Sequence, residues 1–120
     1  MKALSIKCPY SHEIFTGVKN IEYRSWQTSY RGNLLICSSA APKINNMVPG
    51  HAIIVCKLDG IEYVDDCYEW YLTGFRYIKP FKVRGKLGLY NVDDKLIEYI
   101  DRKEATEIYN NLAYKNKKRG

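Results

Sequence analysis

The side chains best suited to chemistry gather in residues 17–26, which read GVKNIEYRSW. With the two-residue period of a strand, Glu22, Arg24 and Trp26 fall on one face, and Lys19 stands just before them. Such a face can bind a flat polar ligand, because a guanidinium donates hydrogen bonds in a fork and an indole stacks. An internal Glu–Arg ion pair beside a core tryptophan fits the same pattern. The residues alone leave both interpretations open.

Other groups capable of catalysis or metal binding are sparse. The four cysteines form no CxxC pair and the two histidines, His12 and His51, are far apart, so we expect no zinc site and no other metal or cofactor. Ser39 ends an apolar run without a nearby histidine, which argues against a Ser–His nucleophile. Helical periodicity places His12 on an exposed surface, where we expect it to be inert.

Composition predicts one globular domain with its own core, since 120 residues suffice without disulfides. The formal charge is +6, but four of the 19 basic residues lie in the last six positions, leaving 15 basic against 13 acidic. We therefore predict a single domain over residues 1–114 and a flexible basic tail over residues 115–120. Unpaired thiols, with no signal peptide and no apolar run of membrane length, predict a cytoplasmic protein without membrane contact, although sequence alone does not exclude cysteine pairing.

Alternating or apolar runs predict six or seven short strands with two helices. The runs cover residues 2–6, 20–26, 34–39, 51–57, 61–64, 68–72 and 87–90, and Thr73-Gly74 break the sixth run before it continues over 75–78. Asp59 and Gly60 predict a hairpin turn, and Pro80 predicts the end of a strand. Pro9 and Gly17 bound a helix over residues 10–16, and a helical period follows from residue 101. The predicted fold is mixed α/β, mainly β: a small barrel with a short N-terminal helix and a C-terminal helix.

The residues also resemble a known family. KALSIKCPYSHEIFTGVKNIEYRSWQTSYRGNLLICSS resembles the N-terminal half of an ASCH domain, a member of the PUA-like superfamily. That family opens with a KALSIKQPW-type strand and helix start, followed by G-x-K-x-x-E-x-R-S-W, a Y-R-G turn, and an apolar strand ending in Ser. The apolar strand from His51, the aromatic strand around Trp70 and IKPFKVRGKLGLYNV fit the second half. The resemblance covers about residues 1–93.

The resemblance implies a PUA-like β-barrel with a cleft between the barrel and the first helix. Family members are associated with RNA binding and modified-nucleobase recognition, so the implied partner is RNA or a nucleoside-like ligand. By the same analogy, eight residues would line or border the cleft: Lys7, Tyr10, Lys19, Glu22, Arg24, Trp26, Arg31 and Ser39. We accordingly predict a binding module that is not an enzyme.

Two departures from the family pattern bear on activity. The family's Gln-Pro-Trp is Cys8-Pro9-Tyr10 here, and Glu22 replaces a threonine that is the proposed nucleophile of amide-hydrolysing members. A carboxylate is a poor substitute for a hydroxyl in forming an acyl intermediate. One alternative is a hydrolase of an acylated nucleoside amide or of RNA, with Glu22 as general base and Lys19 as charge stabiliser. A further alternative is a protein-interaction adaptor that uses exposed tyrosines.

Overall fold

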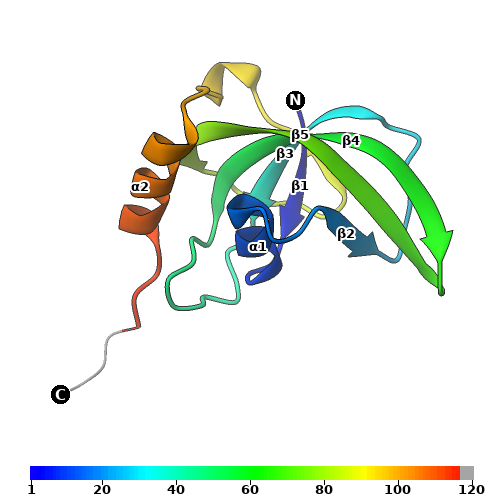
Figure 1. Ribbon diagram of the computed structural model, residues 1–120, viewed down its shortest axis with the longest axis horizontal. Helices are drawn as coiled ribbons and strands as arrows, with labels where there is room; N and C mark the ends of the chain where they lie inside the picture. The colour runs from blue at the N-terminus through cyan, green and yellow to red at the C-terminus, as the bar shows by residue number, and fades with distance from the viewer. Residues whose placement is uncertain (117–120) are drawn as a thin grey trace.

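A computed structural model describes residues 1–116 as a six-stranded mixed sheet with two helices (Figure 1). Its elements are β1 (Lys2–Ile6), α1 (Tyr10–Thr16), β2 (Ile21–Arg24), β3 (Gly32–Ser38), β4 (His51–Val64), β5 (Cys67–Lys82), β6 (Leu89–Asn91), the 3₁₀ helix η1 (Asp94–Leu96) and α2 (Arg102–Leu112). The strand order is β2-β5-β4-β3-β1-β6, and only the β1–β3 pair is parallel. The prediction of a mainly β fold with an early and a late helix is confirmed.

Closure of the sheet into a barrel is not confirmed. Strands β2 and β6 form the two edges, and no ladder joins them within residues 1–116. Each edge strand is short, with four residues in β2 and three in β6, so neither offers enough backbone to bridge the opening. Figure 1 shows the β4–β5 hairpin reaching to the right, away from α2 at the left end.

The predicted hairpin turn at Asp59 and Gly60 is wrong. Strand β4 runs through both residues, and the register against β5 shifts between Leu58 and Gly60. The chain turns instead at Asp65 and Asp66, whose φ angles are 50° and 61°. Two consecutive positive φ angles match the twist of a tight hairpin. The turn therefore lies directly after the last β4–β5 pair, Val64 with Cys67, and not at the glycine.

Pro80 does not end a strand either, because β5 continues to Lys82. The register between β4 and β5 slips between Ala52 and Ile54, which pair with Phe81 and Tyr77. Two extra β5 residues are accommodated there. A proline is tolerated at such an irregularity because the ladder does not require its missing N–H.

The core lies on both faces of the sheet. On β3, Leu34 and Ile36 join a buried cluster with both helices, whereas Leu35 and Cys37 join a second cluster on the opposite face. Aromatic rings connect the two helices, since Phe15 of α1 stacks on Tyr109 of α2 with centroids 4.1 Å apart. Strand β3 is therefore the buried centre of the molecule, and α1 is held in place by tertiary contacts, as its short length requires.

All four cysteines carry free thiols. Burial raises the pKa of Cys37 to about 11 and that of Cys56 to about 12, so these two remain protonated packing residues. Neither helix within residues 1–116 has the length and apolar character needed to cross a membrane.

The predicted basic tail is only partly described. Lys115 donates from Nζ to Oδ1 of Asn46 at 2.6 Å, and the backbone N–H of Asn116 donates to Oδ1 of Asn45 at 3.0 Å. These bonds tie the segment after α2 to the loop between β3 and β4. The rest of the tail prediction, residues 117–120, lies outside the described residues.

Candidate functional site

A cavity of about 1020 Å³ opens where the end of β1, the start of α1 and strand β2 meet. Its walls come from five segments: residues 5–7, Tyr10, residues 19–24, the two residues after β3, and the loop of residues 83–88. The parallel β1–β3 pair brings the ends of both strands to one side, with Ile6 opposite Ser38. The cavity is thus assembled from segments distant in sequence.

Glu22 is the central buried charge of this cavity. The residue is 4% exposed, and both carboxylate oxygens are engaged. Nζ of Lys19 lies 3.4 Å from Oε1, and Nη1 of Arg24 donates to Oε2 at 3.2 Å. Arg24 also donates from Nη2 to the backbone oxygen of Ser5 at 3.5 Å. The carboxylate therefore orients two cations at the cavity, and the predicted internal Glu–Arg ion pair is present.

Local backbone structure places Lys19 at the start of β2. Gly17 ends α1 with a left-handed φ of 87°, which glycine adopts without steric cost. The N–H groups of Val18 and Lys19 both donate to the backbone oxygen of Glu13, at 2.9 and 3.1 Å. The chain consequently reverses within three residues and enters β2 with the lysine facing Glu22.

Two tyrosines flank the ammonium group of Lys19. Its Nζ lies 5.3 Å from the ring centroid of Tyr10 and 4.7 Å from that of Tyr23. Both rings are about half exposed, at 52% and 53%. Tyr23 was not predicted as a site residue, because a period of two assigns it to the face opposite Glu22. The signal that could have identified it is an aromatic residue on an edge strand, four positions after a lysine that can reach over its ring.

The predicted site residues divide into two groups. Six of them line the cavity: Lys7, Tyr10, Lys19, Glu22, Arg24 and Ser39. Trp26 does not line it, because its ring packs edge-to-face on Trp70 with centroids 4.8 Å apart. Arg31 is also outside the cavity, and its Nη1 donates to the backbone oxygens of Thr28 and Tyr30 at 2.8 Å each. Arg31 thus stabilises its own turn.

The loop of residues 83–88 adds basic residues to the cavity lining that were not among the predicted site residues. Arg84 and Lys86 line the cavity from this loop. The loop approaches β1 closely, since a Cβ added to Gly85 would lie 2.8 Å from Oγ of Ser5. With these two residues the lining contains five basic side chains against the single carboxylate of Glu22. The cavity is strongly electropositive as a result.

Comparison with known families identifies a match over nearly the whole chain. The sequence model described as the ASCH domain matches residues 4–117, which extends the resemblance found by inspection through α2. A comparison with curated proteins gives no significant match.

Proposed function

Because the chain belongs to the ASCH domain family, we propose that it binds RNA or a modified nucleobase in the cavity beside Glu22. The family is generally thought to bind RNA. The observation that carries the proposal is the charge of the lining, five basic side chains against one carboxylate that is already paired. Basic side chains gathered in a concave surface attract phosphate and release its counterions, which favours a nucleic-acid ligand.

The side chains of the cavity offer both kinds of contact that a single-stranded ligand needs. Tyr10 and Tyr23 are each about half exposed and offer aromatic rings on which a base can stack, a contact worth about 1–3 kcal/mol per base. Arg24 is held by Glu22 and retains N–H groups for a base edge or a phosphate. Lys19 lies between the tyrosine rings, where its charge can meet a phosphate next to a stacked base.

Catalysis by Lys19 and Glu22 is the less favoured alternative. A general base must reach the proton that it abstracts, within hydrogen-bond distance. Glu22 is buried and each of its oxygens already faces a cation. This arrangement supports a structural and orienting role, so we propose binding rather than hydrolysis of an acylated nucleoside amide or of RNA.

Binding of single-stranded RNA and of modified nucleosides at two salt concentrations tests the proposal. We expect Arg24→Ala and Tyr10→Ala each to weaken binding by about tenfold, through loss of a hydrogen-bonding fork and of a stacking surface. Arg76→Ala is the matched control, because Arg76 is exposed on β5, lies outside the cavity and donates to Oδ1 of Asn33. It should bind as the parent does.

Two outcomes would count against this function. If Arg24→Ala and Tyr10→Ala bind as tightly as the parent, the cavity is not the binding site. If acylated cytidine or RNA is turned over above buffer and Glu22→Gln abolishes that turnover, the hydrolase alternative replaces the binding proposal. Circular dichroism on each variant separates loss of binding from loss of fold.

A further inference from the structure

A second cavity of about 600 Å³ adjoins the first. The two share Ala40, Val83 and Arg84 in their walls, so one surface leads from the first cavity into the second. We propose that the second cavity holds the neighbouring nucleotide of a single RNA strand, with Arg84 contacting the phosphate between the two nucleotides. This inference rests on the proposed function of the first cavity.

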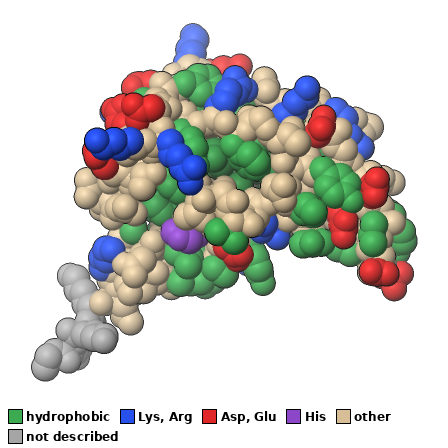
Figure 2. Space-filling model, in the orientation of Figure 1, with side chains coloured by type: hydrophobic (Ala, Val, Ile, Leu, Met, Phe, Trp, Pro, Cys, Tyr) green, Lys and Arg blue, Asp and Glu red, His purple; other side chains and the backbone are tan. Residues whose placement is uncertain are grey.

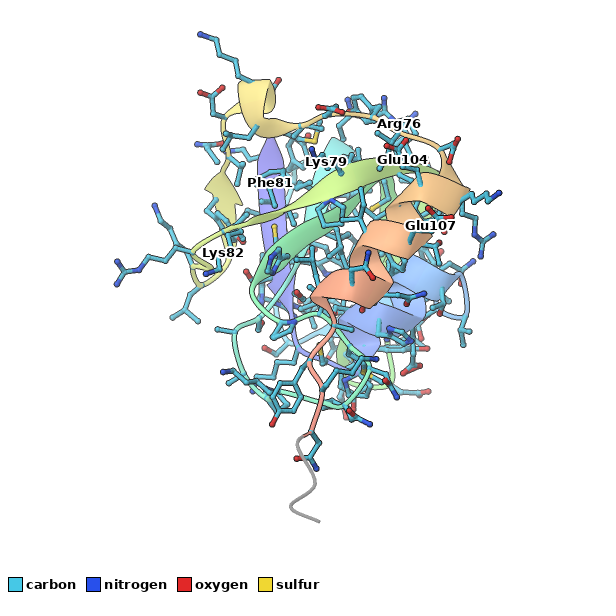
Figure 3. All side chains as sticks on the ribbon, turned by 90° about the vertical axis from the view of Figure 1, so that its left-hand side faces the viewer. Arg76, Lys79, Phe81, Lys82, Glu104 and Glu107 are labelled. Carbon is cyan, nitrogen blue, oxygen red and sulfur yellow. The ribbon has the colours of Figure 1, made fainter. Side chains whose placement is uncertain are left out.

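The charges of the second cavity favour an anionic ligand. Lys43, Lys82 and Arg84 line it, and none of its lining residues is acidic. All three side chains are exposed, and none of them forms an ion pair within residues 1–116. Figure 3 shows Lys82 at the end of β5, well apart from Arg76 in the interior of the same strand. Cations without a protein partner are free to meet the phosphates of a bound strand.

The lining of the second cavity also includes apolar and aromatic residues, which can accept the face of a base. Val83, Leu112 and Tyr114 contribute to it, and Leu112 is 40% exposed. Tyr114 is half-buried and presents an aromatic side chain, the usual partner for an unpaired base. Cationic side chains together with an aromatic one are the combination by which proteins hold single strands without reading duplex grooves.

Backbone hydrogen bonds hold the walls of this cavity in place in the absence of a ligand. The N–H of Asn46 donates to the oxygen of Tyr114 and the N–H of Tyr114 donates to the oxygen of Met47, both at 2.8 Å. The N–H of Val83 donates to the oxygen of Gly50 at 3.2 Å. The loop between β3 and β4 is therefore fixed to the segment after α2 and to the end of β5, which lowers the entropic cost of binding.

The distribution of charge over the protein favours one path for an RNA strand that extends beyond the first cavity. Residues 59–69, at the end of the β4–β5 hairpin, include five acidic and no basic side chains. Figure 2 shows acidic side chains gathered at the right-hand end of the molecule, where this hairpin lies in Figure 1. This end repels a polyanion, so a strand leaving the first cavity is favoured along the basic surface of the second.

The test measures how tightly a short and a longer ligand bind to the parent protein and to a double variant. Lys43→Ala with Lys82→Ala removes two cations that line only the second cavity. We expect a nucleoside monophosphate to bind this variant within about twofold of the parent, and a single-stranded tetranucleotide to bind about tenfold more weakly. The slope of log affinity against log salt for the tetranucleotide should fall by about 1.4, since each phosphate contact contributes about 0.7.

The matched control is Lys57→Ala with Lys103→Ala, which makes the same charge change on exposed residues outside both cavities. The inference is overturned if the two double variants lose equal affinity for the tetranucleotide, or if the monophosphate is affected as strongly as the tetranucleotide. It is also overturned if an acidic peptide binds the parent as tightly as the tetranucleotide and is lost with Lys43 and Lys82. Failure of the proposed function differs, because the parent would then bind neither RNA of any length nor a modified nucleoside.

Discussion

Nζ of Lys19 lies 3.4 Å from Oε1 of Glu22, and this ion pair joins the turn after α1 to the edge strand β2. The Lys19 side chain is 14% exposed and that of Glu22 is 6% exposed, so the pair is largely shielded from water. Charges shielded in this way are hardly screened by salt, and removal of one of them leaves the other unpaired. The pair thus links the fold of this region to the electrostatic character of the cavity.

Substitution of this carboxylate should destabilise the protein. Glu22→Gln keeps the shape but leaves Lys19 and Arg24 without their anion, and we expect the free energy of unfolding to fall by about 2–3 kcal/mol. Lys19→Met should cost less, because Glu22 then retains Arg24. Urea unfolding followed by tryptophan fluorescence measures both changes. An unchanged midpoint in Glu22→Gln would show that the ion pairs do not hold β2 in place.

Trp26 should matter for stability more than for binding. Its ring packs on Trp70, and its backbone oxygen accepts the indole N–H of Trp70 at 3.2 Å. Trp26→Ala should therefore lower the free energy of unfolding by about 2–3 kcal/mol, less than for a fully buried tryptophan because Trp26 is only half-buried.

Binding by Trp26→Ala should change by less than about fivefold, through the Arg24 guanidinium that lies 5.7 Å from the ring of Trp26. Trp26→Phe, which keeps an aromatic ring against Trp70, serves as the control and should recover most of the stability. Loss of RNA binding in a variant that unfolds like the parent would instead make Trp26 a direct ligand contact.

Trp26 also shows the limit of the two-residue strand period as a predictor of side-chain direction. A period of two correctly grouped Glu22 and Arg24, because β2 is a regular strand as far as Arg24. The strand ends there, so the period does not apply to Trp26, and packing against Trp70, 44 residues away, sets its direction. Local signals succeeded for α1 for the same reason: Pro9 and Gly17 act within one helical turn of the ends that they define.

Contacts between segments far apart in the sequence could not be predicted from local sequence patterns. Arg84 and Lys86 reach the cavity because β6 pairs with β1, with Leu89 opposite Leu4, and brings the preceding loop against Ser5. No pattern within residues 83–88 indicates this neighbour. His12 shows the same limit: it was expected to be exposed and inert, yet its ring bonds to a side chain 97 positions away.

The bond of His12 makes stability depend on pH. Nδ1 of His12 lies 2.9 Å from the hydroxyl oxygen of Tyr109, which also accepts the N–H of Val48 at 3.3 Å. When the ring of His12 is neutral with its proton on Nε2, the Tyr109 hydroxyl can donate its proton to Nδ1. Burial raises the pKa of Tyr109 to about 12, so its hydroxyl keeps its proton at neutral pH.

Burial lowers the pKa of His12 below 6.5, although the nearby Glu13 carboxylate raises it in part. The unfolded chain then binds more protons than the folded one once the pH falls below 6.5, and the free energy of unfolding declines toward the pKa of folded His12. Above 6.5 this contribution is fully present. We expect His12→Gln to reduce the difference between unfolding free energies at about pH 7.5 and about pH 5. Equal differences in parent and variant would contradict a role for His12.

Gly85 tests whether the loop of residues 83–88 must lie against β1 for binding. A Cβ at this position would lie 2.8 Å from Oγ of Ser5, which is held by a 2.7 Å hydrogen bond to the hydroxyl of Tyr90. Gly85→Ala should displace the loop, cost about 1–2 kcal/mol of stability and weaken RNA binding. Gly60→Ala is the control, because its Cβ would meet only Tyr71 at an ordinary 3.7 Å.

A second substitution separates this clash from a general effect of alanine in the loop. Ser5→Ala removes the obstructing oxygen, so Gly85→Ala should cost less stability and less RNA affinity in that background than in the parent. Unfolding and binding measured on the four proteins of this cycle give the coupling between the two sites. Additive effects on affinity would mean that the close approach of Gly85 to Ser5 does not shape the cavity, and Arg84 and Lys86 would then have to be positioned by other contacts of the loop.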